Sequence, residues 1–170
     1  MKNKAQDWFK KLRSNLISII EFYDGSSFIE KRWDHSQDGG GLMSTIKGNL
    51  IEKGGVNIST VSGKFSKEMR KKIPGATENP AYWATGISVV LHPFNPNIPS
   101  MHFNTRYLET TKKWFGGGMD LTPCLNFQNE AKIFHMGLNK MCDKHDVLYY
   151  EKYKKWCDEY FFIKHRNEAR

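Results

Sequence analysis

The chain has 170 residues, 39% hydrophobic and 14% aromatic, so it can bury a core and is predicted to fold as one domain over residues 1–170. Its 26 Lys and Arg against 18 Asp and Glu give a charge of +8, which attracts anions without choosing among nucleic acid, lipid headgroups and polycarboxylates. The longest apolar runs, 16–20 and 87–91, are too short to span a bilayer, and no apolar signal-peptide core follows the amino terminus.

The first predicted element is a helix over residues 3–23. Its apolar side chains recur at helical spacing, and Asp24-Gly25 is the predicted stop. A glycine-rich turn is predicted at 38–41. Residues 44–65 then alternate apolar and polar side chains between glycines, which predicts two or three strands of a meander.

Two further strands are predicted over residues 83–92 and 100–110. The glycine runs at 39–41 and 116–118 resemble neither a Walker loop nor a dinucleotide-binding loop, so both are interpreted as tight turns.

Helices are predicted at 128–144 and 149–170, and the second has no stop signal, as if the chain ended inside an element. A helix, antiparallel strands and then helices together predict an α+β architecture.

The strand at 100–110 is predicted to place His102, Asn104 and Arg106 on one face, about 7 Å apart along the strand. A guanidinium matches a carboxylate in a bidentate manner, and an imidazole can transfer a proton near neutral pH. The neighbouring strand offers Ser88 and His92 on one face, predicted to lie beside the first set. An anionic substrate is one interpretation; the other is a solvated face without a role.

Asp120 follows the second glycine run and could accept N–H bonds from a ligand, or serve as a structural cap or turn residue.

The six histidines include neither HExxH nor zinc-finger spacing, so the sequence itself gives little support for a metal. His135 and His165 are interpreted as partly buried histidines with bonded rings. The three cysteines form no CxxC pair, which suits a reducing cytoplasm.

The stretches WFGGGMDLTP (114–123) and HPFNPNIPSMHFNTRY (92–107) closely resemble oxygen-dependent coproporphyrinogen III oxidases. Further matches lie at 24–33, 54–63 and 153–170, so the resemblance runs from near the amino terminus to the last residue. It implies a broad antiparallel sheet flanked by helices, and a homodimer. It also implies oxidative decarboxylation of two propionates of coproporphyrinogen III to vinyl groups, giving protoporphyrinogen IX in haem biosynthesis. Molecular oxygen would be the co-substrate, with no redox cofactor.

The resemblance also implies roles for individual residues. His102 matches a proton donor, Ser88 a substrate-contacting serine, and Asp120 a carboxylate that faces pyrrole N–H groups. The family's substrate-binding tripeptide falls on Asn104, Thr105 and Arg106, with Arg106 as the partner of a propionate. A divalent metal is implied at four family histidines, which here are His92, His102, His135 and His165.

The chain departs from the family at Cys124-Leu125, where relatives commonly have an aromatic pair. The family continues past the stretch that matches Arg170, so the chain is expected to be the amino-terminal part of a longer domain. One alternative is an inactive fragment that at most binds porphyrin or a partner subunit. A nucleic-acid-binding domain is disfavoured, because no RNP-type strand or zinc module accompanies the spread positive charge.

Overall fold

The computed structural model describes residues 1–125 and 128–168, which divide into two compact units. The sheet unit comprises Met1–Asn95 and Met101–Met119, and the helical unit comprises Pro96–Ser100 and Asp120–Arg170. No helix in the described part of the chain is long and apolar enough to cross a membrane.

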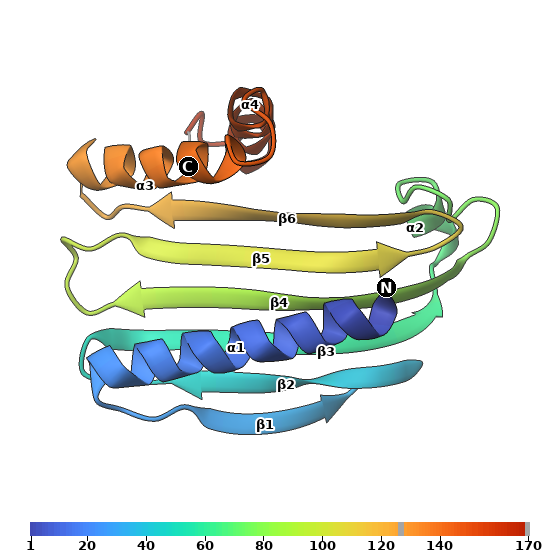
Figure 1. Cartoon of the computed structure of the whole chain (residues 1–170), viewed down its shortest axis with the longest axis horizontal. Helices are drawn as coiled ribbons and strands as arrows, with labels where there is room; N and C mark the ends of the chain where they lie inside the picture. The colour runs from blue at the N-terminus through green and yellow to red at the C-terminus, as the bar shows by residue number, and fades with distance from the viewer. Residues whose placement is uncertain (126–127, 169–170) are drawn as a thin grey trace. The chain divides into compact units, whose positions relative to one another are not determined.

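The strands form one six-stranded sheet in the order β1-β2-β3-β4-β5-β6, so each strand neighbours the next along the chain (Figure 1). Pairing is antiparallel from β1 through β5. This confirms the predicted α+β class with its antiparallel sheet. The elements are α1 (Lys2–Asp24), β1 (Ile29–Asp34), β2 (Asp38–Ile46), β3 (Ile51–Lys64), α2 (Lys67–Arg70), β4 (Ala81–Pro93), β5 (Ser100–Glu109), β6 (Lys113–Thr122), α3 (Gln128–Cys142) and α4 (Tyr149–Phe161).

Helix α1 lies across one face of the sheet, in front of β3 in Figure 1. The helix forms because its apolar residues recur every three or four positions, which gives it one continuous apolar side. Phe9, 2% exposed, packs there against Val56 of β3 and Val89 of β4 in a shared core. The core also includes Tyr107 of β5. Burial of these side chains fixes which face of each strand points toward α1.

The carboxyl end of α1 is joined to the β2–β3 turn by Asp24, which is 4% exposed. The Asp24 carboxylate accepts backbone N–H bonds from Asn49, Leu50 and Ile51 at 2.8–2.9 Å. Gly25 follows in the left-handed conformation with φ 77°, as the predicted helix stop requires. Asp24 therefore both ends the helix and organises a turn about 25 residues away.

Both glycine runs lie within strands, so their interpretation as tight turns was wrong. Residues 39–41 belong to β2 and 116–118 to β6. The reason is close backbone approach: a Cβ on Gly40 would lie 2.2 Å from the Trp33 carbonyl oxygen, and one on Gly117 would lie 2.2 Å from that of Asn104. The run at 39–41 does include one turn-like residue, Gly39, with φ 84°.

We expect Gly117→Ala to lower the free energy of unfolding by about 2 kcal/mol, because the added methyl group has to displace backbone atoms of β5. Gly116→Ala is the matched control in the same strand, since its Cβ would meet nothing nearer than 3.8 Å. Urea denaturation of both variants measures the difference. Equal midpoints would contradict the close approach of β5 and β6 at Gly117.

The helical unit corrects the prediction for the last helix. Helix α4 ends at Phe161 rather than continuing to Arg170, and Phe162 is extended with φ −64° and ψ 123°. The chain turns instead, and the Ile163 N–H donates to the Glu168 carbonyl at 2.9 Å. The final residues, 169–170, lie outside the described residues. The α3 prediction is confirmed to within two residues at its end.

Candidate functional site

The face of β4 and β5 turned away from α1 carries the polar side chains singled out in the sequence. Since Ile87, Val89 and Tyr107 belong to the core under α1, the alternate residues of both strands face the other way. We call this surface the polar face; its members are Ser88, His92, His102, Asn104 and Arg106.

The strand register brings these residues side by side. Ser88 lies directly opposite Asn104, and Val90 lies directly opposite His102. Directly opposed side chains in an antiparallel pair have Cβ atoms about 5 Å apart. The prediction that the two strands contribute to one polar face is therefore confirmed. Ser88 and Arg106 are exposed and the other three members are half-buried, so the face is not covered by apolar packing.

Arg106 makes a hydrogen bond within the polar face: its Nη2 donates to Oδ1 of Asn104 at 3.0 Å. The rest of the exposed guanidinium retains donors for a ligand. A planar cation with free N–H groups is the partner that a carboxylate prefers.

His92 and His102 lie next to each other on the polar face, with ring centroids 5.8 Å apart and planes at 82°. Burial lowers the pKa of His92 below its ordinary value of 6.5, and the nearby charges of Lys53 and His102 lower it further. The folded protein therefore favours the neutral His92 imidazole. A neutral ring can accept a proton or a hydrogen bond at one nitrogen.

We expect His92 to titrate below pH 6.5 in a ¹H–¹³C NMR titration, and Lys53→Gln to raise the pKa of His92 by removing one repulsive charge. Because the pKa of His92 is lower in the folded protein than the ordinary 6.5, the stability that neutral His92 contributes is fully present above pH 6.5. It is lost as the pH falls below 6.5 and through the lowered pKa. His92→Gln assigns the resonance. A His92 midpoint above 6.5 would show that the ring is neither desolvated nor repelled.

Thr105 is the one member of the tripeptide at 104–106 that is turned away from the polar face. It lies directly opposite the buried Ile87 and therefore shares the face covered by α1. Any contact between Thr105 and a ligand on the polar face would have to use its backbone.

Three predicted residues lie in the helical unit, and each has its own surroundings. Asp120 is 8% exposed and lies two residues before the end of β6. Its charge acts on a neighbouring thiol: the pKa of Cys157 is raised by burial first and then by the charges of Asp158 and Asp120.

The two predicted histidines of the helical unit differ in their surroundings. The half-buried His135 ring hydrogen-bonds the Tyr150 hydroxyl at 3.1 Å, which confirms the interpretation of a bonded histidine. His165 is exposed, so its expected burial was wrong, because α4 ends before reaching it.

The metal predicted at His92, His102, His135 and His165 stays a prediction. Within residues 1–125 and 128–168, no three His, Cys, Asp or Glu side chains come close enough together to hold a metal ion. The adjacent pair on the polar face offers two imidazoles, which is fewer ligands than a zinc site uses. No step below depends on a metal.

Asn57 of β3 was missed by the sequence reasoning. It lies directly opposite Ser88, so the row across β3, β4 and β5 reads Asn57, Ser88, Asn104. The only signal in the sequence is that Asn57 falls within the matched stretch GGVNISTVSG. Its place beside Ser88 follows from the register of strands that lie about 30 residues apart.

Comparison with known proteins agrees with the resemblance. Residues 4–170 match the family model described as Coproporphyrinogen III oxidase. A protein of Rickettsia akari named oxygen-dependent coproporphyrinogen-III oxidase is 48% identical over 99% of this chain. A protein of the same name from Rickettsia bellii is 54% identical over 98% of it. The chain spans 64% of the length of the first relative and 63% of the second.

Proposed function

The chain belongs to the coproporphyrinogen III oxidase family, and from this membership we propose that it takes part in the oxygen-dependent decarboxylation of coproporphyrinogen III to protoporphyrinogen IX. The observation that carries the proposal is the polar face, where Arg106, His102 and Ser88 project from the same side of two adjacent strands. The substrate bears four propionates, and a chain of charge +8 attracts a polycarboxylate.

Each decarboxylation converts a propionate side chain into a vinyl group. The propionate loses carbon dioxide, one proton and two electrons, and molecular oxygen accepts the electrons. A porphyrinogen is electron-rich, so it can supply these electrons to oxygen without a redox cofactor. The share of the protein is then to position the substrate and to stabilise charge.

The residues would divide this work among them. Arg106 binds a propionate carboxylate and selects which one reacts, while Ser88 and Asn104 add hydrogen bonds to it. His102 holds or delivers the proton. Asp120 would accept hydrogen bonds from the pyrrole N–H groups and so make the ring still more electron-rich.

Other features of the protein belong to the same proposal. We place it in the cytoplasm, a reducing compartment that suits the free thiols of Cys124, Cys142 and Cys157. It would act as a homodimer, as the family resemblance implies, with no nucleic acid as partner. The single domain over residues 1–170 would be part of a longer one, since the curated relatives are longer.

The test is to incubate the chain with coproporphyrinogen III in air and to separate the porphyrins by chromatography after oxidation. Formation of vinyl-bearing products that His102→Gln and Asp120→Asn abolish would support the proposal. Binding of the tetrapyrrole without any vinyl product would instead support a second function, a fragment that only binds porphyrin; the partial coverage of the relatives favours that alternative. Neither binding nor product would overturn both.

A further inference from the structure

Asn57 faces the same side of the sheet as Ser88 and Asn104. The register sets Asn57 opposite Ser88 and Ser88 opposite Asn104, so three polar side chains form a row across β3, β4 and β5. Neighbouring strands lie about 4.8 Å apart, which makes the row about 10 Å long. A Cβ on Gly55, two residues before Asn57, would meet Asn57 Nδ2 at 3.1 Å. The half-buried Asn57 amide therefore extends toward Gly55, which has no side chain of its own to displace it.

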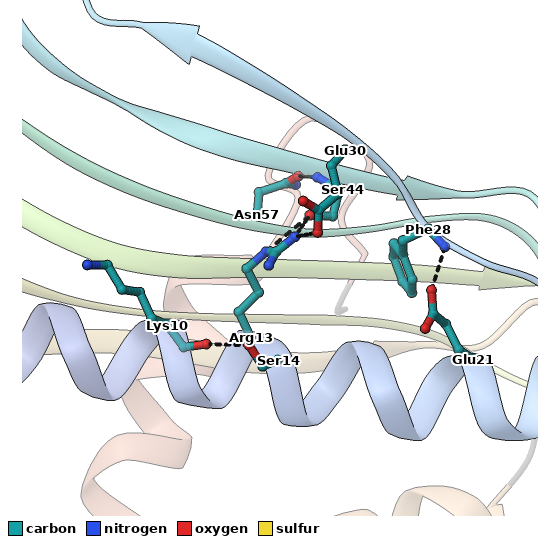
Figure 2. Close-up of polar contacts among 8 residues, drawn as sticks. All are labelled: Lys10, Arg13, Ser14, Glu21, Phe28, Glu30, Ser44 and Asn57. Atoms are coloured by element: carbon teal, nitrogen blue, oxygen red, sulfur yellow. Dashed lines mark hydrogen bonds and ion pairs between the residues drawn. The ribbon is translucent and has the colours of Figure 1, made fainter.

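The orientation of the Asn57 amide is determined by a backbone donor. The Ser44 N–H donates to Asn57 Oδ1 at 3.1 Å (Figure 2). A backbone N–H can only donate, so the oxygen has to face Ser44 and the NH₂ group has to face away. Ser44 is itself fully buried, and its hydroxyl accepts bonds from Arg13 Nε at 3.1 Å and Nη2 at 2.5 Å. The contact that orients Asn57 thus comes from a buried, hydrogen-bonded residue of β2.

Asn104 is oriented in the same way by a different donor. The Arg106 guanidinium donates a hydrogen bond to Asn104 Oδ1, and a guanidinium, like a backbone N–H, can only donate. Within the described residues, the Nδ2 groups of Asn57 and Asn104 have no hydrogen-bond partner. The row therefore presents an amide N–H donor at each end and a hydroxyl, Ser88, in the middle. Such a row matches acceptor groups on a ligand rather than donors.

We propose that Asn57 is a further substrate-binding residue, whose Nδ2 donates a hydrogen bond to a carboxylate oxygen of the substrate bound on the polar face. This inference rests on the proposed function, because it takes the ligand to be a polycarboxylate tetrapyrrole. It adds β3 to the strands that bind the ligand, so the site spans three strands. Two propionates of one tetrapyrrole can then be bound at opposite ends of the row.

Asn57→Asp tests the proposal directly. Aspartate keeps an oxygen for the Ser44 N–H but replaces the NH₂ donor with a second, negatively charged acceptor. We expect the affinity for coproporphyrin III, the stable oxidised form of the substrate, to fall about tenfold or more in a fluorescence titration of the whole chain, since a hydrogen bond to a charged group is lost and a like charge takes its place. Asn15→Asp makes the same charge change on the exposed side of α1 and should leave the affinity unchanged.

The side-chain amide gives a second readout that does not depend on a variant. In the wild-type chain, the ¹H–¹⁵N NMR signal of the Asn57 NH₂ group should shift on addition of coproporphyrin III and stay in place on addition of its tetramethyl ester, which has no carboxylates. An unshifted signal in both cases would overturn the role of Asn57.

The outcomes separate this inference from the proposed function. If Arg106→Ala weakens binding but Asn57→Asp binds like the wild type, Asn57 is not a ligand contact and the proposed function stands. If the wild-type chain binds no coproporphyrin III, the proposed function fails for this chain and the inference fails with it.

Discussion

Asp24→Ala is expected to lower the free energy of unfolding by about 3 kcal/mol, one of the two largest effects that the structure predicts. Alanine leaves the N–H groups of Asn49, Leu50 and Ile51 without their acceptor, and an unsatisfied donor costs about 1–3 kcal/mol when it is buried. Asn49 and Leu50 are exposed, so water can replace part of what their N–H groups lose. Each of the three donors is therefore expected to cost about 1 kcal/mol, the lower end of that range. Urea denaturation measures it.

The control for Asp24 is Asp7→Ala in the same helix. The Asp7 side chain is 74% exposed and its ion pair with Lys10 is 4.0 Å long, so its removal should change the free energy of unfolding by about 0.5 kcal/mol or less. If Asp24→Ala were as mild as Asp7→Ala, Asp24 would not be what joins α1 to the β2–β3 turn.

Asp24 also predicts how stability responds to acid. Burial by itself raises the pKa of Asp24, but the backbone N–H bonds of Ile51, Asn49 and Leu50 outweigh it and lower the pKa from 3.8 to about 2. A lowered folded-state pKa gives stability that is fully present above pH 3.8 and is lost as the pH falls toward 2, about 2 kcal/mol in all. Asp24→Ala should lack this part of the acid transition when unfolding is followed by circular dichroism.

Arg106→Ala is expected to weaken coproporphyrin III binding about thirtyfold, the largest effect expected on the ligand. Arg106 supplies the guanidinium of the polar face, and a charge-assisted bond to a carboxylate contributes about 1.5–3 kcal/mol. Arg106→Ala also removes the donor that holds Asn104 Oδ1, so the Asn104 amide is free to rotate. Arg106→Lys keeps the charge without the planar fork and should bind with intermediate affinity.

Arg32→Ala is the matched control for Arg106→Ala. Arg32 is an exposed arginine on β1 whose register places it, through Leu42 and Ile58, on the face covered by α1. Its loss changes the net charge equally but should leave affinity within about twofold. If both variants weakened binding alike, the effect would be long-range attraction, and Arg106 would not be a specific contact.

The sequence predicted well wherever a local pattern repeats over many residues. The helix of residues 3–23 and its stop at Asp24-Gly25 are confirmed by α1 and by the left-handed Gly25. Alternation along β5 correctly placed His102, Asn104 and Arg106 on one face, because side chains alternate in any strand. The predictions for substrate contacts at these residues remain to be tested.

The errors arose where distant backbone, rather than local preference, decides the conformation. Glycine usually indicates a turn, yet Gly40 and Gly117 lie inside strands because a neighbouring strand leaves no room for a Cβ. Helix α4 was predicted too long because its apolar spacing continues past Phe161, where pairing of Ile163 with Glu168 takes the chain out of the helix.

The sequence by itself determined the family, the α+β class and the composition of each strand face, because these depend on residue types and on spacings within a few positions. Only the tertiary structure decided that Asn57 lies beside Ser88 and that Asp24 binds the β2–β3 turn. Both depend on the register between segments far apart in the chain. A strand pattern repeats every two residues, so it is compatible with many registers until pairing and core burial select one.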